Sequence, residues 1–287
     1  YSEIKTEHSS CPFGREPKQE YFNIKNFNIL KKMNHSHFSI KLVSLAVMIF
    51  MGTLAQAQTK IIAHRGYWDC AGSAQNSLTS LRAADAIGTY GSEFDIHLTK
   101  DNKIVVHHDP NIGATQIQTT NYKDLKKFKL KNGERIPTLE EYLDAAKTLK
   151  TRIILEIKAQ YSQSHEDSLV RQAVEMVKAK GLESRTDYIS FSGNACLLVK
   201  KLSPNSAVSY LNGDWDPQTI KDKGLDGIDY HYRVLGAHPE WIKQCHDLGL
   251  TVNVWTVNDL NDIDGFIKAG VDFITTNKPV EALKLAQ

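Results

Sequence analysis

The chain has few cysteines, and their spacing argues against two common kinds of stabilised protein. Only four of its 287 residues are cysteine, and no two of them form a CxxC pair, the spacing typical of zinc sites. Cys11 lies in a segment that we expect to be removed, which leaves Cys70, Cys196 and Cys245. An odd number argues against a disulfide framework, although it leaves room for a single bridge in an oxidising compartment.

The chain also lacks a strong excess of charge of either sign. It has 35 Lys and Arg residues against 33 Asp and Glu, a net charge of +2. Residues 1–57 hold seven of the basic and four of the acidic residues, so 58–287 keep 28 basic and 29 acidic ones, a net charge of −1. The composition therefore gives no argument for nucleic-acid binding. The lysine-rich stretch 123–131 is typical of a solvated face, with phosphate or membrane contact as the less favoured alternative.

Hydrophobic runs long enough to cross a bilayer are missing as well. The apolar run 42–54 is too short to do so. It follows Lys41 and precedes Ala55-Gln56-Ala57, which is the order of basic, apolar and small-residue regions in a secretory signal peptide. No cysteine follows closely enough for lipid attachment, so we expect no stable membrane anchor.

These observations divide the chain into three parts. We expect residues 1–32 to be an upstream leader, residues 33–57 to be the signal peptide, and residues 58–287 to be one exported domain. The destination of that domain is then the periplasm or the medium. The sequence leaves its oligomeric state open.

Short β-branched runs alternate with helical patterns along residues 58–287. The runs are 61–63, 92–98, 104–106, 152–158, 188–191, 207–211, 227–230, 250–255 and 273–275. Several helical patterns between them stop at a glycine, as at Gly181 and Gly270. The count of about eight βα units predicts an α/β protein with a single-domain (β/α)8 TIM barrel. An open doubly wound sheet is the structural alternative.

Charged residues interrupt these runs where a buried strand would normally exclude them. The two-residue period places Glu93 and Asp95 on one face of 92–98, and it places Glu156 and Lys158 on one face of 152–158. Three carboxylates from two strands are the oxygen ligands that Mg²⁺ or Ca²⁺ prefers, so we expect one divalent cation here. The alternative is that basic residues neutralise them in salt bridges, namely Arg65, Arg152 or Lys158.

Two histidines at strand ends add acid and base chemistry. His64 and His108 titrate near neutral pH and can serve as a general acid and a general base. Arg65 and Lys158 carry the positive charge that holds a phosphoryl group. Together with a cation, these residues predict metal-assisted phosphodiester cleavage. We expect structural roles for two further strand-end histidines, His97 and His107.

The motifs around these residues resemble those of the glycerophosphodiester phosphodiesterase family, in the same order along nearly all of 58–287. They are Ala63-His64-Arg65-Gly66, Gln75-Asn76-Ser77, Glu93 to Asp101, Val105 to Asp109, Ile136 to Glu141, Leu155 to Lys158, Val254 to Asn258 and Ile274 to Pro279. The resemblance implies a TIM-barrel hydrolase that converts small-molecule glycerophosphodiesters into glycerol 3-phosphate and an alcohol. It also implies roles for individual residues: His64 and His108 as the acid/base pair, Glu93, Asp95 and Glu156 as ligands of one Mg²⁺ or Ca²⁺, Arg65 and Lys158 on the phosphate, and Trp255 against the carbon side of the glycerol.

One tripeptide departs from the family pattern. Where the family usually has P-E-N, this chain has Ala74-Gln75-Asn76, so a carboxylate is replaced by a neutral amide. Gln75 still forms hydrogen bonds, and we expect it to bind substrate or to change the substrate or metal preference. The loop from Pro110 to Pro137 stands where the family carries an insertion and is short here, which places it at the alcohol side of the pocket.

Two other functions fit the same residues. One is a related phosphodiesterase that acts on lysophospholipids or sugar-phosphate diesters, because a fold and its site persist while the leaving group changes. The other is a non-catalytic exported protein that binds phosphate head groups. Both enzymes would lose turnover on His64→Ala, whereas a binding protein would show none to lose.

Overall fold

The computed structural model describes residues 58–287, and the predictions for residues 1–32 and 33–57 lie outside the described residues. Within residues 58–287, no helix is both long and apolar enough to cross a membrane.

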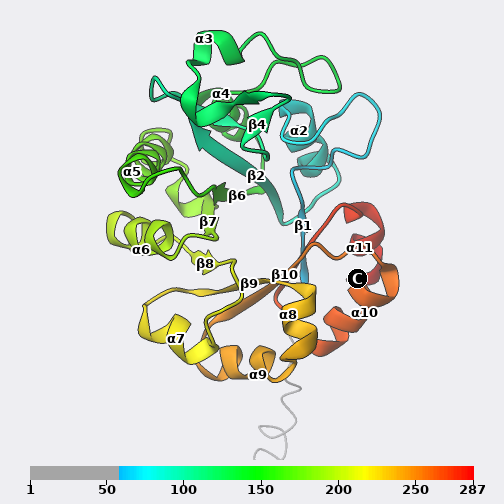
Figure 1. Cartoon of the computed structure of the whole chain (residues 1–287). Coiled ribbons are helices and arrows are strands. Elements are labelled where there is room, and N and C mark those ends of the chain that lie inside the picture. The colour runs from blue at the N-terminus through cyan, green and yellow to red at the C-terminus, as the bar shows by residue number, and fades with distance from the viewer. Residues whose placement is uncertain (1–57) are drawn as a thin grey trace, which may run out of the picture. The chain divides into compact units, whose positions relative to one another are not determined.

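Parallel strands form a closed ring at the centre of the described residues (Figure 1). In chain order they are β1 (Lys60–Ala63), β2 (Gly91–Leu98), β6 (Arg152–Ile157), β7 (Thr186–Ser190), β8 (Val208–Tyr210), β9 (Gly227–His231), β10 (Thr251–Trp255) and β11 (Phe273–Thr276). β11 pairs with β1, and β1 pairs with β2, which closes the ring. The closed parallel ring confirms the TIM-barrel prediction and contradicts the doubly wound alternative.

Helices surround the ring on its outside (Figure 1). They are α2 (Leu78–Ala86), α4 (Leu139–Ala146), α5 (Gln163–Ala179), α6 (Gly193–Leu202), α7 (Pro217–Asp222), α8 (Tyr232–Ala237), α9 (Glu240–Asp247), α10 (Leu260–Ala269) and α11 (Pro279–Leu285), with a 3₁₀ turn η3 (Glu183–Arg185) before β7. The prediction that helices end at a glycine is confirmed at two positions, because Gly181 and Gly270 both adopt a left-handed backbone just beyond α5 and α10.

The strands turn their apolar side chains outward onto these helices. Ile153, Leu155 and Ile157 of β6 are fully buried in the main hydrophobic core, as predicted. Phe94 of β2 stacks on Tyr142 of α4 with ring centroids 4.1 Å apart. Because side chains alternate along a strand, the charged residues of β2 and β6 then project into the barrel.

The run 104–106 differs from the other predicted strands, because it is not a member of the ring. It forms β3 (Ile104–Val106), which runs antiparallel to β2 and pairs Val106 with Ile96. The chain thus turns at the end of β2 and comes back along it. This return brings His107 to the level of Asp95, whose carbonyl accepts a hydrogen bond from the His107 backbone N–H.

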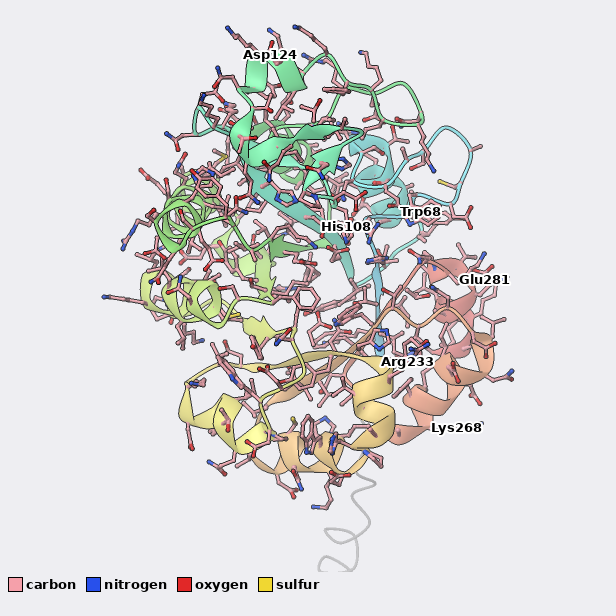
Figure 2. The ribbon with its side chains drawn as sticks, viewed as in Figure 1. Trp68, His108, Asp124, Arg233, Lys268 and Glu281 are labelled. Atoms are coloured by element: carbon pink, nitrogen blue, oxygen red, sulfur yellow. The ribbon has the colours of Figure 1, made fainter. Side chains whose placement is uncertain are left out.

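The loop from Pro110 to Pro137 has a small core of its own. It contains β4 (Asn111–Ile112), β5 (Thr115–Gln116), a 3₁₀ turn η2 (Ile117–Thr119) and α3 (Tyr122–Leu125). Ile117, Leu125 and Ile136 are buried together with Val105 of β3. In Figure 2, Asp124 on α3 lies at the periphery while His108 lies near the centre of the ring.

Candidate functional site

Three buried carboxylates from the middle of β2 and the carboxyl end of β6 meet inside the barrel. Asp95 and Glu156 are direct partners across the two parallel strands, and Glu93 lies two residues before Asp95. One oxygen of each carboxylate lies within 4.8 Å of the others. The strand register therefore brings together the three residues that the sequence predicts as metal ligands.

The electrostatics of this cluster fit a hard divalent cation. Among the described residues, Glu93 Oε1, Asp95 Oδ1 and Glu156 Oε1 are buried without an aligned hydrogen-bond donor. Burial, followed by repulsion from Asp95, raises the pKa of Glu156 to about 8, and burial with its two acidic neighbours also raises the pKa of Glu93. A cation bound to oxygen ligands would add positive charge to the cluster and keep all three groups ionised.

Two basic residues contact the cluster. Lys158 Nζ lies 2.7 Å from Glu156 Oε1 and 3.2 Å from Asp95 Oδ1, and Arg65 Nε lies 3.9 Å from Asp95 Oδ2. Burial acts to raise the pKa of Asp95, but Lys158 and further donors outweigh it and hold that pKa well below its usual range. Arg152 does not take part, because it pairs with Asp187 at 2.5 Å. Lys158 and Arg65 thus pair with part of the cluster, as the salt-bridge alternative predicts, whereas Arg152 does not.

His64 directly follows β1, and its hydrogen bonds determine which ring nitrogen carries the proton. Its Nδ1 lies 2.9 Å from Asn277 Oδ1, which also accepts a hydrogen bond of 3.0 Å from Trp68 Nε1. Because an indole N–H only donates, the Asn277 atom must be the oxygen, and we assign the proton of His64 to Nδ1. Burial, assisted by Arg65, lowers the pKa of His64 to about 4. His64 is therefore neutral near pH 7, with a free lone pair on Nε2.

His108 reaches the site two residues beyond the end of the returning strand β3. Its Nδ1 lies 2.6 Å from Asp109 Oδ1, and its carbonyl oxygen lies 3.1 Å from Nε2 of His97. Burial lowers the pKa of His108, while Asp95 and Asp109 act in the opposite direction. His97 is itself buried inside the barrel, so its contact with His108 agrees with the structural role expected for it.

An inner cavity of about 150 Å³ collects most of the predicted residues. It is lined by His64, Arg65, Glu93, His108, Glu156, Lys158 and Trp255, together with apolar residues that include Ile189, Phe191 and Leu211. Trp255 lies at the end of β10, the seventh strand of the ring, and its indole N–H donates to the Asp229 carbonyl at 2.9 Å. Its ring faces the cavity edge-on to Phe191 rather than lying in the core between strands and helices.

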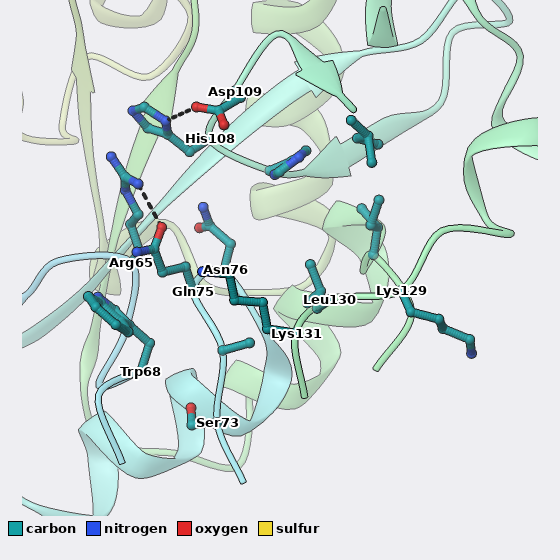
Figure 3. A pocket seen from close by; sticks show the side chains of 14 residues that line it. Arg65, Trp68, Ser73, Gln75, Asn76, His108, Asp109, Lys129, Leu130 and Lys131 are labelled. Carbon is teal, nitrogen blue, oxygen red and sulfur yellow. Dashed lines mark hydrogen bonds and ion pairs between the residues drawn. The ribbon is translucent and has the colours of Figure 1, made fainter. Parts of the chain in front are cut away.

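A second, adjoining cavity of about 440 Å³ opens beside the first (Figure 3). Arg65 and His108 line both cavities, whereas Gln75 lines only the adjoining one. Gln75 Oε1 accepts a hydrogen bond of 2.7 Å from Arg65 Nη1. The neutral amide therefore positions the arginine without neutralising its charge.

Sequence reasoning missed three polar residues of the site. Asn76 has a left-handed φ of 59°, and its side chain donates to Asp95 Oδ2 at 2.9 Å and accepts from the Asp95 backbone N–H at 3.2 Å. Asn277 orients His64. Asp229 of β9 is fully buried in the wall of the inner cavity, its Oδ1 has no partner among the described residues, and burial raises its pKa to about 7.

The cysteines of the described residues take no part in the site. Cys70, Cys196 and Cys245 are all free thiols, and the latter two are buried. The single disulfide that the sequence leaves possible is therefore not formed among the described residues.

Comparisons with known proteins identify relatives of the chain. Residues 64–281 match the model of the glycerophosphoryl diester phosphodiesterase family. A curated glycerophosphodiester phosphodiesterase of Caldanaerobacter subterraneus is 28% identical over 244 residues, which cover 80% of this chain and 98% of that protein.

Solved structures agree with this match. A glycerophosphodiester phosphodiesterase from Parabacteroides distasonis is 51% identical, with a TM-score of 0.80 over 81% of this chain and 98% of that one. A phosphodiesterase from Oleispira antarctica, solved in complex with the product sn-glycerol-3-phosphate, is 23% identical, with a TM-score of 0.68 over 79% of this chain and 96% of that one. The latter likeness shows the fold alone.

Proposed function

The chain belongs to the glycerophosphoryl diester phosphodiesterase family, and we propose that it hydrolyses glycerophosphodiesters to glycerol 3-phosphate and an alcohol with a divalent cation and a histidine pair. The observation that carries the proposal is the set of three buried carboxylates with oxygens within 4.8 Å of one another, two of which, Glu93 and Glu156, line one cavity with His64 and His108. A non-catalytic head-group protein would have no need for this arrangement.

Glu93, Asp95 and Glu156 would hold the cation, either Mg²⁺ or Ca²⁺. When bound, such an ion supplies Lewis-acid stabilisation of the charge that develops on phosphoryl oxygens. Arg65 and Lys158 flank the carboxylates and orient the phosphoryl group through charge-assisted hydrogen bonds. Trp255 covers the apolar side of the glycerol.

The two histidines have different surroundings, and we assign them different roles. His64 has its lone pair on Nε2 and lines only the inner cavity, so it accepts the proton of the attacking hydroxyl. His108 lines both cavities, so it stands where the departing alcohol leaves the inner cavity, and Asp109 opposes the burial that lowers its pKa. We assign to it the donation of a proton to the oxygen of the departing alcohol, and solvent restores the starting protonation of both rings.

A panel of glycerophosphodiesters tests the proposal. Each substrate is assayed for release of glycerol 3-phosphate after EDTA treatment and again after Mg²⁺ or Ca²⁺ is restored. We expect activity to disappear with EDTA and to return with one of the two ions. If no substrate in the panel yields glycerol 3-phosphate with either ion, the proposal is wrong.

We also propose that residues 33–57 direct export and that the mature protein begins at Gln58. The support is the order of basic, apolar and small residues in that segment. N-terminal sequencing of the protein recovered from periplasm and medium would give Gln58 as the first residue. Recovery of the whole chain in the cytoplasm would contradict the proposal.

A further inference from the structure

The adjoining cavity opens beside His108, the residue that we assign to protonate the departing alcohol. It shares Arg65 and His108 with the inner cavity. If glycerol occupies the inner cavity and the phosphoryl group lies between Arg65 and Lys158, the second alcohol of the diester extends past His108 into the adjoining cavity. This placement rests on the proposed function, and it makes the residues of the adjoining cavity the ones that select the alcohol.

The charges that line the adjoining cavity are mostly positive. Arg65, Lys129 and Lys131 line it, and Asp109 is the one carboxylate among its described lining residues. Asp109 already binds His108, whereas neither lysine has an ion-pair partner within 4.0 Å among residues 58–287. In Figure 3 the side chain of Lys131 extends toward the Gln75 side of the cavity, while Lys129 points away from it. Lys131 is thus the lysine placed to meet a bound alcohol.

Gln75 preserves this positive character. Its amide oxygen holds Arg65 Nη1 at 2.7 Å, a position from which a carboxylate would cancel the guanidinium charge. The amide gives the same orientation to Arg65 without the negative charge. Position 75 consequently adds no negative charge to the cavity, and Lys131 keeps its own positive charge.

The remaining walls are unsuited to a cationic alcohol. Ile112, Leu130 and Ile136 form an apolar side, and Trp68 is the one Phe, Tyr or Trp among the described lining residues. Proteins that bind quaternary ammonium groups surround them with several aromatic faces or a free carboxylate. A choline-like alcohol would find neither in this cavity.

We propose that the adjoining cavity binds a leaving alcohol that carries its own anionic group, a phosphate ester or a carboxylate, so that the preferred substrates are glycerophosphodiesters with an anionic alcohol. Lys131 contacts that group, and the apolar wall packs on the carbon chain that connects it to the scissile phosphate. Hydrolysis adds water across the bond between phosphorus and the alcohol oxygen and releases glycerol 3-phosphate and the anionic alcohol.

Three substrates that release alcohols of different charge test the proposal. Glycerophosphoglycerol releases neutral glycerol, bis(glycerophospho)glycerol releases an alcohol with a second phosphodiester, and glycerophosphocholine releases a cation. We expect kcat/KM to fall in the order anionic, neutral, cationic, with about tenfold between the extremes after correction for the two equivalent ends of bis(glycerophospho)glycerol. The difference shrinks at high salt, because the lysine is exposed.

Two variants and one matched control assign the preference to the cavity. Lys131→Met lowers kcat/KM for bis(glycerophospho)glycerol by about threefold to fivefold and leaves the value for glycerophosphoglycerol unchanged. Gln75→Glu adds a negative charge beside Arg65 and shifts the preference toward glycerophosphocholine. Lys126→Met removes an exposed lysine of the same loop that does not line the cavity, and it leaves all three values unchanged.

Equal kcat/KM for the three substrates in the unmodified enzyme would overturn the inference, as would equal losses on the anionic and neutral substrates in Lys131→Met. Both results leave the proposed function intact, because the substrates are still cleaved. Failure of the proposed function is a separate outcome, in which none of the three yields glycerol 3-phosphate with Mg²⁺ or Ca²⁺.

Discussion

Replacing Asp229 with asparagine should change how the stability of the barrel depends on pH. Asp229 is fully buried, its Oδ1 has no partner among the described residues, and burial raises its pKa from an ordinary value of 3.8 to about 7. Between these two values the folded protein keeps a proton that the unfolded chain releases. Stability therefore falls as the pH rises from 3.8 to 7, and it is constant with respect to this group above that range.

The size of the effect follows from the width of that window. A difference of about three pH units corresponds to about 4 kcal/mol of unfolding free energy, and about half of it is reached near pH 5.5. An asparagine side chain does not titrate, so the variant avoids this loss. The two proteins will differ in unfolding free energy at pH 4 by some amount. By pH 8 this difference should shift by about 4 kcal/mol in favour of Asp229→Asn.

Urea unfolding of both proteins at four or five pH values provides the measurement. EDTA is present throughout, so that cation binding to the nearby carboxylates does not contribute, and equal m-values show that the same transition is compared. The change in the difference between the two proteins isolates Asp229 from every other titrating group. A difference that stays constant from pH 4 to pH 8 would refute the reasoning.

The remaining predictions concern the catalytic residues. His64→Ala should lower kcat by at least about 100-fold while Tm stays near that of the unmodified protein, and an active variant would remove His64 from the proton transfer. Asn277→Ala frees the His64 ring from its Nδ1 partner, so kcat should fall by about tenfold with little change in KM, as steady-state kinetics would show. Binding of Mg²⁺ or Ca²⁺, followed by calorimetry, should weaken by up to about tenfold for each pH unit from 8 to 6, because Glu156, with a pKa of about 8, must lose its proton to bind. Affinity independent of pH would argue against Glu156 as a ligand.

The parts of the fold that follow from side-chain alternation could be predicted from the sequence. The period of two in β2 and β6 correctly divides Glu93, Asp95 and Glu156 from the apolar residues that face the helices. Periodicity says nothing about strand direction, however. Nothing in the run 104–106 distinguishes an antiparallel strand from another member of the ring, so the route by which His108 reaches Asp95 was visible only in the structure.

The missed residues have physical reasons of their own. Asn76 and Asn277 are neutral amides, and their importance lies in which atoms they meet across 19 and 213 positions of sequence. Asp229 did carry a usable signal, because it is a charge inside the predicted strand 227–230. Arg152 forms an ion pair with Asp187, whereas Asp229 Oδ1 has no partner among the described residues. This difference depends on which residues are neighbours in space.

The hairpin of β2 and β3 has a consequence for how this barrel can diversify. Glu93, Asp95 and His108 belong to one continuous segment, Glu156 lies on the flanking strand β6, and His64 directly follows the other flanking strand, β1. Trp255 and Asp229, by contrast, stand on β10 and β9 across the ring. Local pairing therefore holds the reactive residues in one part of the ring, while Trp255, proposed to cover the glycerol, stands on the opposite side, so substitutions there can change how the glycerol is recognised while the reactive residues stay assembled.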